Sequence, residues 1–167
     1  PKDGRVGYFP GASFAWRISE ESFWGGNIAN VISDLRIRGS YAEVGNTNIG
    51  NYPYIGSYGS AQYGSQNGIG FSNFGNDQLR WEAQQKLDFG LDFGLFENRF
   101  VGSIAYWFQY NADIILQAPT PPSVGIPGNF INQNVGRLKG RGIEFSLDAR
   151  VLRTSNFRWD ASFNFST

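Results

Sequence analysis

The sequence predicts an all-β protein whose antiparallel strands form part of a transmembrane β-barrel wall. Between residues 81 and 114, apolar and hydrophilic side chains alternate with a period of two, which is the signature of a β-strand. All charges of these strands fall on one of the two phases. The connections between strands alternate between short and long. Long strands with one apolar face, joined by short turns on one side and long loops on the other, are typical of outer-membrane barrels.

The clearest pair of strands runs from Trp81 to Leu95 and from Phe100 to Ile114. In the first of them one face carries the apolar side chains Leu87, Phe89, Leu91, Phe93 and Leu95. In the second the apolar face carries Ile104, Tyr106, Phe108, Tyr110 and Ile114, and Trp107 lies on the opposite face. Residues 96–99 are then left as a tight turn, so the pair is expected to be a hairpin.

Four further strands are predicted from weaker alternation, at Gly7–Ile18, Leu35–Ala42, Gly142–Val151 and Phe157–Ser166. The third of these could begin earlier, near Val135. Because proline cannot donate a ladder hydrogen bond, Pro10 predicts a bulge or an irregular start in the first strand.

The distribution of charge decides how the two faces are interpreted. The apolar phase of the six strands carries no charged residue, whereas the opposite phase carries charges on every strand. A charge at the midplane of a lipid-facing wall costs about 2–4 kcal/mol, so the apolar phase is expected to face lipid. The charges expected to face the barrel lumen are Arg36, Arg38, Glu82, Lys86, Asp88, Asp92, Glu144, Asp148, Arg150, Arg158 and Asp160.

Paired carboxylates also suggest acid–base catalysis. Here they occur on nearly every strand and alternate with basic residues, so a hydrated, salt-bridged wall explains them better. The chain has no histidine and no cysteine, which removes the commonest general base and the commonest metal ligands. We therefore predict no catalytic residues, no metal, no cofactor and no enzymatic activity.

The composition excludes several other classes of protein. The net charge is zero, and no basic cluster of the kind that binds phosphate backbones is present, so a nucleic-acid partner is not expected. No stretch approaches the roughly 20 apolar residues of a transmembrane helix. Because the chain starts at Pro1 and ends within a predicted strand, we interpret residues 1–167 as one partial β-barrel domain of a longer protein, with the plug domain and the remaining strands absent.

The connections predict where a ligand would be met. Residues 152–156 are short like 96–99, residues 43–80 and 116–134 are long, and 19–34 is intermediate, with Ser19 as the expected cap of a short helix. The long loops are rich in glycine, asparagine and aromatic residues. They form either a sugar- or peptide-binding surface or an ordered loop whose aromatic rings pack on their neighbours. The candidate contacts for a ligand or a lid are Tyr52, Tyr54, Tyr58, Tyr63, Phe130 and Asn132.

An ordered series of short motifs carries a family resemblance. It consists of YFP at 8–10, WRISEE at 16–21, ISDLRIRGSY at 32–41, GN at 45–46, IGNY at 49–52, LRWE at 79–82, GLDFGLF at 90–96, NVG at 134–136, GIEF at 142–145, FRW at 157–159 and FNFS at 163–166. Each motif is weak alone, but their order across nearly the whole chain resembles the barrel wall of SusC-like TonB-dependent outer-membrane transporters.

The resemblance implies a barrel of about 22 strands in a Gram-negative outer membrane. It also implies an N-terminal plug coupled to the TonB complex, a SusD-like surface lipoprotein as a lid, and an imported oligosaccharide or peptide. Three other interpretations stay open: a passive porin, a soluble β-sandwich carbohydrate-binding module and a barrel enzyme. The soluble module would bury Leu87, Phe89, Ile104 and Phe145 between two packed sheets, whereas a barrel wall would leave them on an open face in contact with lipid.

Overall fold

The computed structural model describes residues 6–46 and 54–167 and contains eight strands in two sheets. The larger sheet has six strands in the order β1-β2-β5-β6-β7-β8, and the smaller one is the hairpin β3–β4. The strands are β1 (Gly11–Arg17), β2 (Ile32–Asn46), β3 (Ser57–Tyr63), β4 (Gln66–Asn73), β5 (Glu82–Leu95), β6 (Phe100–Pro119), β7 (Phe130–Arg153) and β8 (Arg158–Ser166). The fold is thus all-β, as the alternation predicts.

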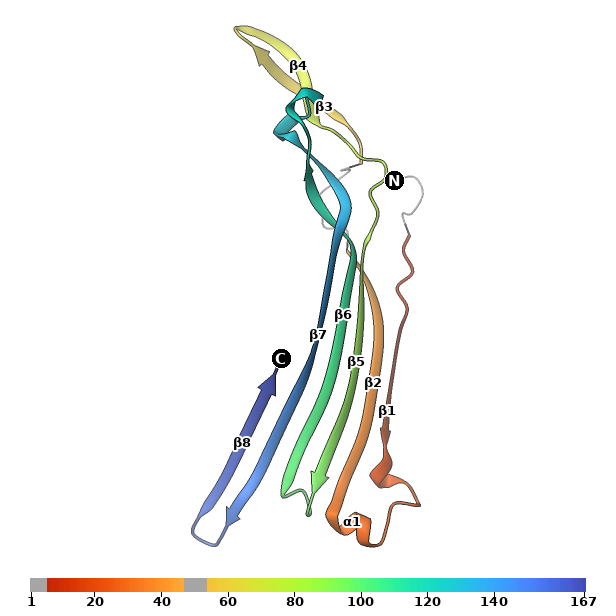
Figure 1. Ribbon diagram of the computed structural model, residues 1–167, viewed down its shortest axis with the longest axis vertical. Coiled ribbons are helices and arrows are strands. Elements are labelled where there is room, and N and C mark those ends of the chain that lie inside the picture. Colours follow the sequence, from red (N-terminus) through yellow and green to blue (C-terminus); the bar gives the residue numbers. More distant parts are fainter. Residues whose placement is uncertain (1–5, 47–53) are drawn as a thin grey trace. The chain divides into compact units, whose positions relative to one another are not determined.

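The chain divides into two compact units, and β2, β5, β6 and β7 contribute residues to both. The first unit contains 43–84 and 110–138 together with the N-terminal residues up to Phe9. The second unit contains Pro10–Ala42, Gln85–Gln109 and Lys139–Thr167. In this unit the strands follow the order of the larger sheet, with β1 and β8 at its two edges (Figure 1).

The registers of the second unit confirm the predicted phases at both edges of the sheet. At one edge Trp16 of β1 lies opposite Ile37 of the antiparallel strand β2. At the other edge Phe145 of β7 lies opposite Phe165, and Leu147 lies opposite Phe163. Since cross-strand partners share a face, the apolar phases of neighbouring strands form one continuous apolar face.

The apolar face of the second unit is exposed. Leu87, Phe89 and Ile104 keep 43%, 51% and 43% of their surface accessible, and Phe163 keeps 57%. Among the described residues the only other sheet is the two-stranded β3–β4, which belongs to the first unit. The β-sandwich interpretation is therefore wrong, because the core that it requires does not form.

The short connections lie together at one end of the second unit (Figure 1). The turn 96–99 contains Phe96, Glu97 and Asn98 in the left-handed region, with φ of 52°, 56° and 60°. This conformation is uncommon for residues with a side chain, and β2 supports it. The Ser33 hydroxyl accepts a 3.0 Å hydrogen bond from the Asn98 amide and donates one of 3.2 Å to the Gly94 carbonyl.

A β-bulge interrupts the ladder between β7 and β8. Arg150 lies opposite Asp160 and Leu152 lies opposite Trp159, so Val151 is the extra residue. The Arg99 guanidinium donates to the carbonyls of Arg150 and Val151 at 3.1 and 2.8 Å. Two backbone acceptors at the irregularity are thereby satisfied. The bulge brings Leu152 opposite Trp159 and so into line with the apolar phase.

The first unit holds the element that alternation did not predict. Residues 57–73, expected to be loop, form the hairpin β3–β4 around Gly64, which has a φ of 61°. The buried hydrophobic residues of the described chain are Leu79 and Ile126, at 2% and 6% exposure. They give this unit a small core, whereas the second unit is a single layer.

Several predicted boundaries need correction. β2, β6 and β7 are longer than expected, so the connection predicted at 116–134 shrinks to 120–129, and the turn predicted at 152–156 covers 154–157. β1 starts only after Pro10, which agrees with the proline argument. Ser19 caps no helix: the residue before the 3-10 helix Ile18–Glu20 is Arg17, and the Ser19 hydroxyl donates to Asp34 at 2.9 Å. The α-helix, α1, covers Asn27–Val31 and follows Gly26.

Candidate functional site: the charged face of the sheet

The centre of the charged face in the second unit is a carboxylate held between two arginines. Asp92 of β5 accepts hydrogen bonds from Arg36 at 2.8 and 3.0 Å and from Arg38 at 3.3 Å, both on β2. The Asp92 side chain is 26% exposed, and those of Arg36 and Arg38 are 42% and 39% exposed. The cluster carries a net positive charge and keeps donors open to solvent, so it can bind an anionic or carbonyl-bearing group.

Arg38 reaches across the neighbouring strand because that strand offers no side chain at the crossing point. A Cβ at Gly90 would lie 2.6 Å from the guanidinium carbon of Arg38. Glycine at position 90 therefore lets the arginine lie flat over β5. This close approach explains why glycine interrupts the polar phase of β5 here.

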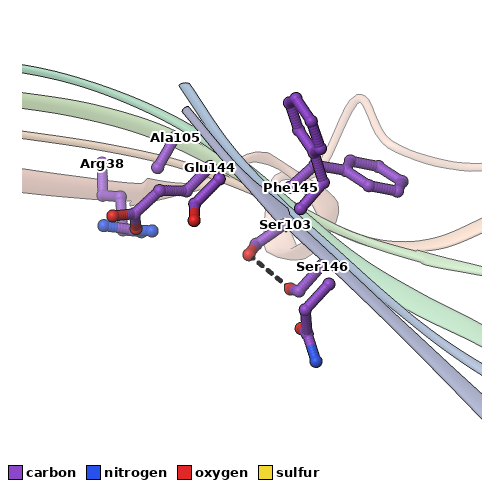
Figure 2. A pocket seen from close by; sticks show the side chains of 9 residues that line it. Arg38, Ser103, Ala105, Glu144, Phe145 and Ser146 are labelled. Carbon is purple, nitrogen blue, oxygen red and sulfur yellow. Dashed lines mark hydrogen bonds between the residues drawn. The ribbon is translucent and has the colours of Figure 1, made fainter. Parts of the chain in front are cut away.

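An open cavity of about 330 Å³ is lined in part by Arg38, Ser103, Glu144 and Ser146. The Ser103 and Ser146 hydroxyls are 2.8 Å apart and hydrogen-bonded. Figure 2 shows these two serines on one side of the strands and Phe145 pointing to the other. Within the described residues Glu144 has no ion pair. The cavity therefore combines a free carboxylate, a guanidinium and hydroxyl groups, which suits a hydrogen-bonding solute or protein segment.

An indole lies on the same face, beside this cavity. Trp107 of β6 is two residues from Ala105, which lines the cavity. Cβ atoms added to Gly140 and Gly142 of β7 would meet its ring at 3.1 and 2.8 Å. The two glycines thus make the space in which the ring rests on β7. The alternation assigns Trp107 to the hydrophilic face, but only the structure shows that its ring packs over the two glycines.

The other predicted lumen charges of the second unit share this face. Lys86 lies 3.8 Å from Asp88, and Arg158 pairs with Asp160 on the same strand. Asp148 accepts a 2.6 Å hydrogen bond from Ser162, its neighbour across β7 and β8. Arg150 lies opposite Asp160 in the ladder. These contacts are local and partly solvated, which fits a wetted wall better than a catalytic centre.

Glu82, in the first unit, has a structural role that the sequence does not suggest. Its carboxylate accepts hydrogen bonds from the Ile115 amide at 2.8 Å and the Asn46 side chain at 2.7 Å. Nearby, Asp113 lies within β6 with a φ of 54°, and its carbonyl accepts a 2.7 Å hydrogen bond from Asn134. Glu82 and Asn134 thus satisfy backbone groups around an irregular point of β6.

The structure describes some of the predicted ligand contacts. Tyr58 stacks on Phe71 across the β3–β4 hairpin, with ring centroids 4.5 Å apart, and is 65% exposed. Tyr54 is half-buried and Phe130 is exposed at the start of β7. The Asn132 carbonyl accepts a 2.8 Å hydrogen bond from Asn76. Tyr52 lies outside the described residues, as does the side chain of Tyr63, whose backbone ends β3.

The geometry defines a class of protein. A single-layered sheet with long strands, one exposed apolar face and one charged, hydrogen-bonded face is the wall of a membrane β-barrel. None of the helices in the described residues is long and apolar enough to span a membrane.

Comparison with known proteins identifies the family. Residues 2–167 match the family model described as TonB dependent receptor-like, beta-barrel. The chain belongs to this family, and its sheet is part of the family's barrel wall.

Two curated relatives match nearly the whole chain. TonB-dependent receptor P3 of Formosa agariphila is 34% identical over 169 residues, which is 99% of this chain and 16% of the relative. TonB-dependent receptor SusC of Bacteroides thetaiotaomicron is 32% identical over 175 residues, covering 98% and 17%. This chain therefore spans about a sixth of the length of these relatives, both of which are named as TonB-dependent receptors.

Solved structures agree with the sequence comparison. The RagAB peptide importer in its closed-closed state superposes with a TM-score of 0.83 at 29% identity, over 99% of this chain and 18% of the importer chain. The open-open state gives a TM-score of 0.82 at the same identity, over 98% and 18%. The barrels of this family are outer-membrane proteins, and the sequence-based assignment to SusC-like transporters is confirmed.

Proposed function

We propose that this chain is a wall section of a SusC-like active importer that takes up oligosaccharides or peptides across the outer membrane. In this proposal the strands cross the membrane several times, a SusD-like lipoprotein covers the outside, and the TonB complex supplies energy through a plug domain beyond this chain. The observation that carries the proposal is the match of residues 2–167 to the TonB-dependent family, together with the exposed apolar face of the sheet.

The charged face supports a role along the solute path or against the plug. Asp92, Arg36 and Arg38 form a polar cluster with open donors, and Trp107 adds an aromatic surface. Such groups bind hydroxyls, amides and carboxylates without chemical change. The hydrophilic phase therefore guides or holds a partner, and the apolar phase meets acyl chains.

The first unit supplies the proposed contacts with ligand or lid. We assign this role to Tyr54, Tyr58, Phe130 and Asn132, and to Tyr52 and Tyr63 from the sequence alone. The names of the similar proteins differ in whether they state a ligand. The structural neighbour is named as a peptide importer, whereas SusC is named only as a receptor. Both oligosaccharides and peptides therefore remain in the proposal as ligand classes.

The proposal is tested by measuring uptake in cells that produce the full-length protein. Labelled oligosaccharide and peptide mixtures are supplied to wild-type cells, to cells lacking the gene and to cells lacking TonB. We expect uptake of one class to be lost in both mutants. Uptake that persists without TonB and without a proton gradient would identify a passive porin instead.

A point substitution tests the proposed contacts. Tyr58→Ala removes an exposed ring from the hairpin and is expected to lower uptake, whereas Tyr58→Phe retains the ring that stacks on Phe71. Ile69→Ala is the matched control, because Ile69 is 82% exposed on the same hairpin. Equal losses from Tyr58→Ala and Ile69→Ala would exclude a specific role for Tyr58.

A further inference from the structure

We propose that Lys139 and Arg141 form a binding site for the phosphate of an outer-leaflet lipid headgroup, on the outer side of the barrel wall. This inference rests on the proposed function, because it requires the apolar face to contact the outer membrane. The two residues belong to the second unit and lie on β7 just before its apolar stretch.

The direction of both side chains follows from the strand. Gly140 and Gly142 each present their Cβ position to Trp107, which shares the hydrophilic face with Ser103. Because successive residues of a strand point to opposite faces, Lys139 and Arg141 point to the apolar side, in phase with Ile143. They are basic residues on the phase that excludes charge elsewhere in the second unit.

Their depth matches the edge of a bilayer. On the apolar side of β7, the stretch from Ile143 to Leu152 covers about ten residues, which is the length that a tilted transmembrane strand requires. On β5 the apolar phase likewise runs from Leu95 to Leu87 and becomes polar at Gln85. Lys139 and Arg141 therefore lie at the headgroup level, at the end away from the short turns. Because the short turns of outer-membrane barrels face the periplasm, this end lies at the outer leaflet.

No carboxylate of the second unit lies on this side of the sheet beside Arg141. The acidic residues of this unit are on the hydrophilic face or near the short turns: Asp34, Asp88, Asp92, Glu144, Asp148 and Asp160, and Glu20, Glu21 and Glu97. Among the described residues Arg141 has no ion pair. Lys139, which has a further interaction within the protein, adds a second charge about 7 Å along the strand.

The chemistry of this pair selects a phosphate. Arginine presents a planar fork of donors that matches phosphate oxygens, and lysine adds a point charge. Both side chains have long aliphatic stems that lie along apolar surface while the charged ends reach the headgroups. A phosphorylated lipid satisfies both requirements, because its acyl chains cover Ile143 and Phe145 and its phosphate meets the cations.

The test uses the full-length protein, purified from outer membranes in a mild detergent. Lipid A is titrated onto wild-type and variant proteins, and bound molecules are counted by native mass spectrometry. A basic residue near a lipid surface is worth about fivefold in affinity, so Arg141→Ser should weaken binding about fivefold and the double change Lys139→Ser, Arg141→Ser about thirtyfold.

Four controls make the outcome decisive. Arg150→Ser removes a cation from the opposite face of the same strand and should leave lipid affinity unchanged. Lys139→Arg with Arg141→Lys should bind like the wild type, because both charges remain. Dephosphorylated lipid A should bind all forms alike, and inorganic pyrophosphate should compete poorly, since it lacks acyl chains.

Equal lipid A affinity in the wild type and the double variant would overturn the site, as would an equal loss in Arg150→Ser. Failure of the proposed function is a separate result, because the wild type would then not be recovered from the outer membrane or would not support uptake. A double variant that is recovered normally and transports normally, but binds lipid A more weakly, supports the site.

Discussion

A charge placed at mid-depth on the apolar face tests the physical basis of this fold. Leu147 lies opposite Phe163, halfway along the apolar stretch from Ile143 to Leu152. If this face meets lipid, Leu147→Arg costs about 2–4 kcal/mol, which shifts the unfolding equilibrium about 30- to 900-fold. The same substitution at Ile143, near the bilayer edge, costs about 0–1 kcal/mol.

The assay is urea unfolding of the full-length protein in phospholipid vesicles, followed by tryptophan fluorescence. Asn164→Arg is the matched control, because Asn164 lies opposite Ser146 on the hydrophilic face. We expect a loss that is large at position 147, small at 143 and smallest at 164. Equal losses at positions 147 and 164, or no dependence on depth, would refute the assignment of the apolar phase to lipid.

Two further substitutions test the polar contacts. Asp92→Asn leaves Arg36 and Arg38 without their shared carboxylate. Because all three side chains are partly exposed, the free energy of unfolding should fall by about 1 kcal/mol. An unchanged free energy of unfolding in a urea titration would show that these three side chains do not stabilise the fold. Glu82→Ala leaves the Ile115 amide without its acceptor and should cost about 1–3 kcal/mol, whereas Glu82→Gln should retain most of the stability. Equal effects of the two Glu82 substitutions would show that the carboxylate contacts are unimportant.

The faces of the sheet could be predicted because a period of two leaves little freedom. Once Leu87 and Leu147 are assigned to the lipid-facing side, every second residue of their strands must face the same way. The registers at both edges of the sheet agree with this assignment. The hairpin β3–β4 was not predicted, because glycine, serine and asparagine weaken the alternation of apolar and polar residues in its strands. A weak signal was present in Gly64-Ser65, the kind of two-residue turn that joins hairpin strands.

The face of the sheet on which the candidate site lies could be predicted, but the contacts between its side chains could not. The alternation places Asp92 and Arg38 on one face, but their pairing depends on the order of strands in the sheet, which brings β5 beside β2. Glu82 was expected to be a lumen charge, yet it supports the backbone near an irregular point of β6. Such irregularities depend on local geometry that no periodic pattern encodes.

The bulge at Val151 has a consequence for changes in chain length. Removing Val151 would join Arg150 to Leu152, whose partners Asp160 and Trp159 are already adjacent, so the deletion should be absorbed by straightening the strand. Removing Leu147 would instead invert every following residue of β7, turning Arg150 toward hydrocarbon. Insertions and deletions in this wall should therefore be tolerated at such existing defects and rejected within the regular ladder.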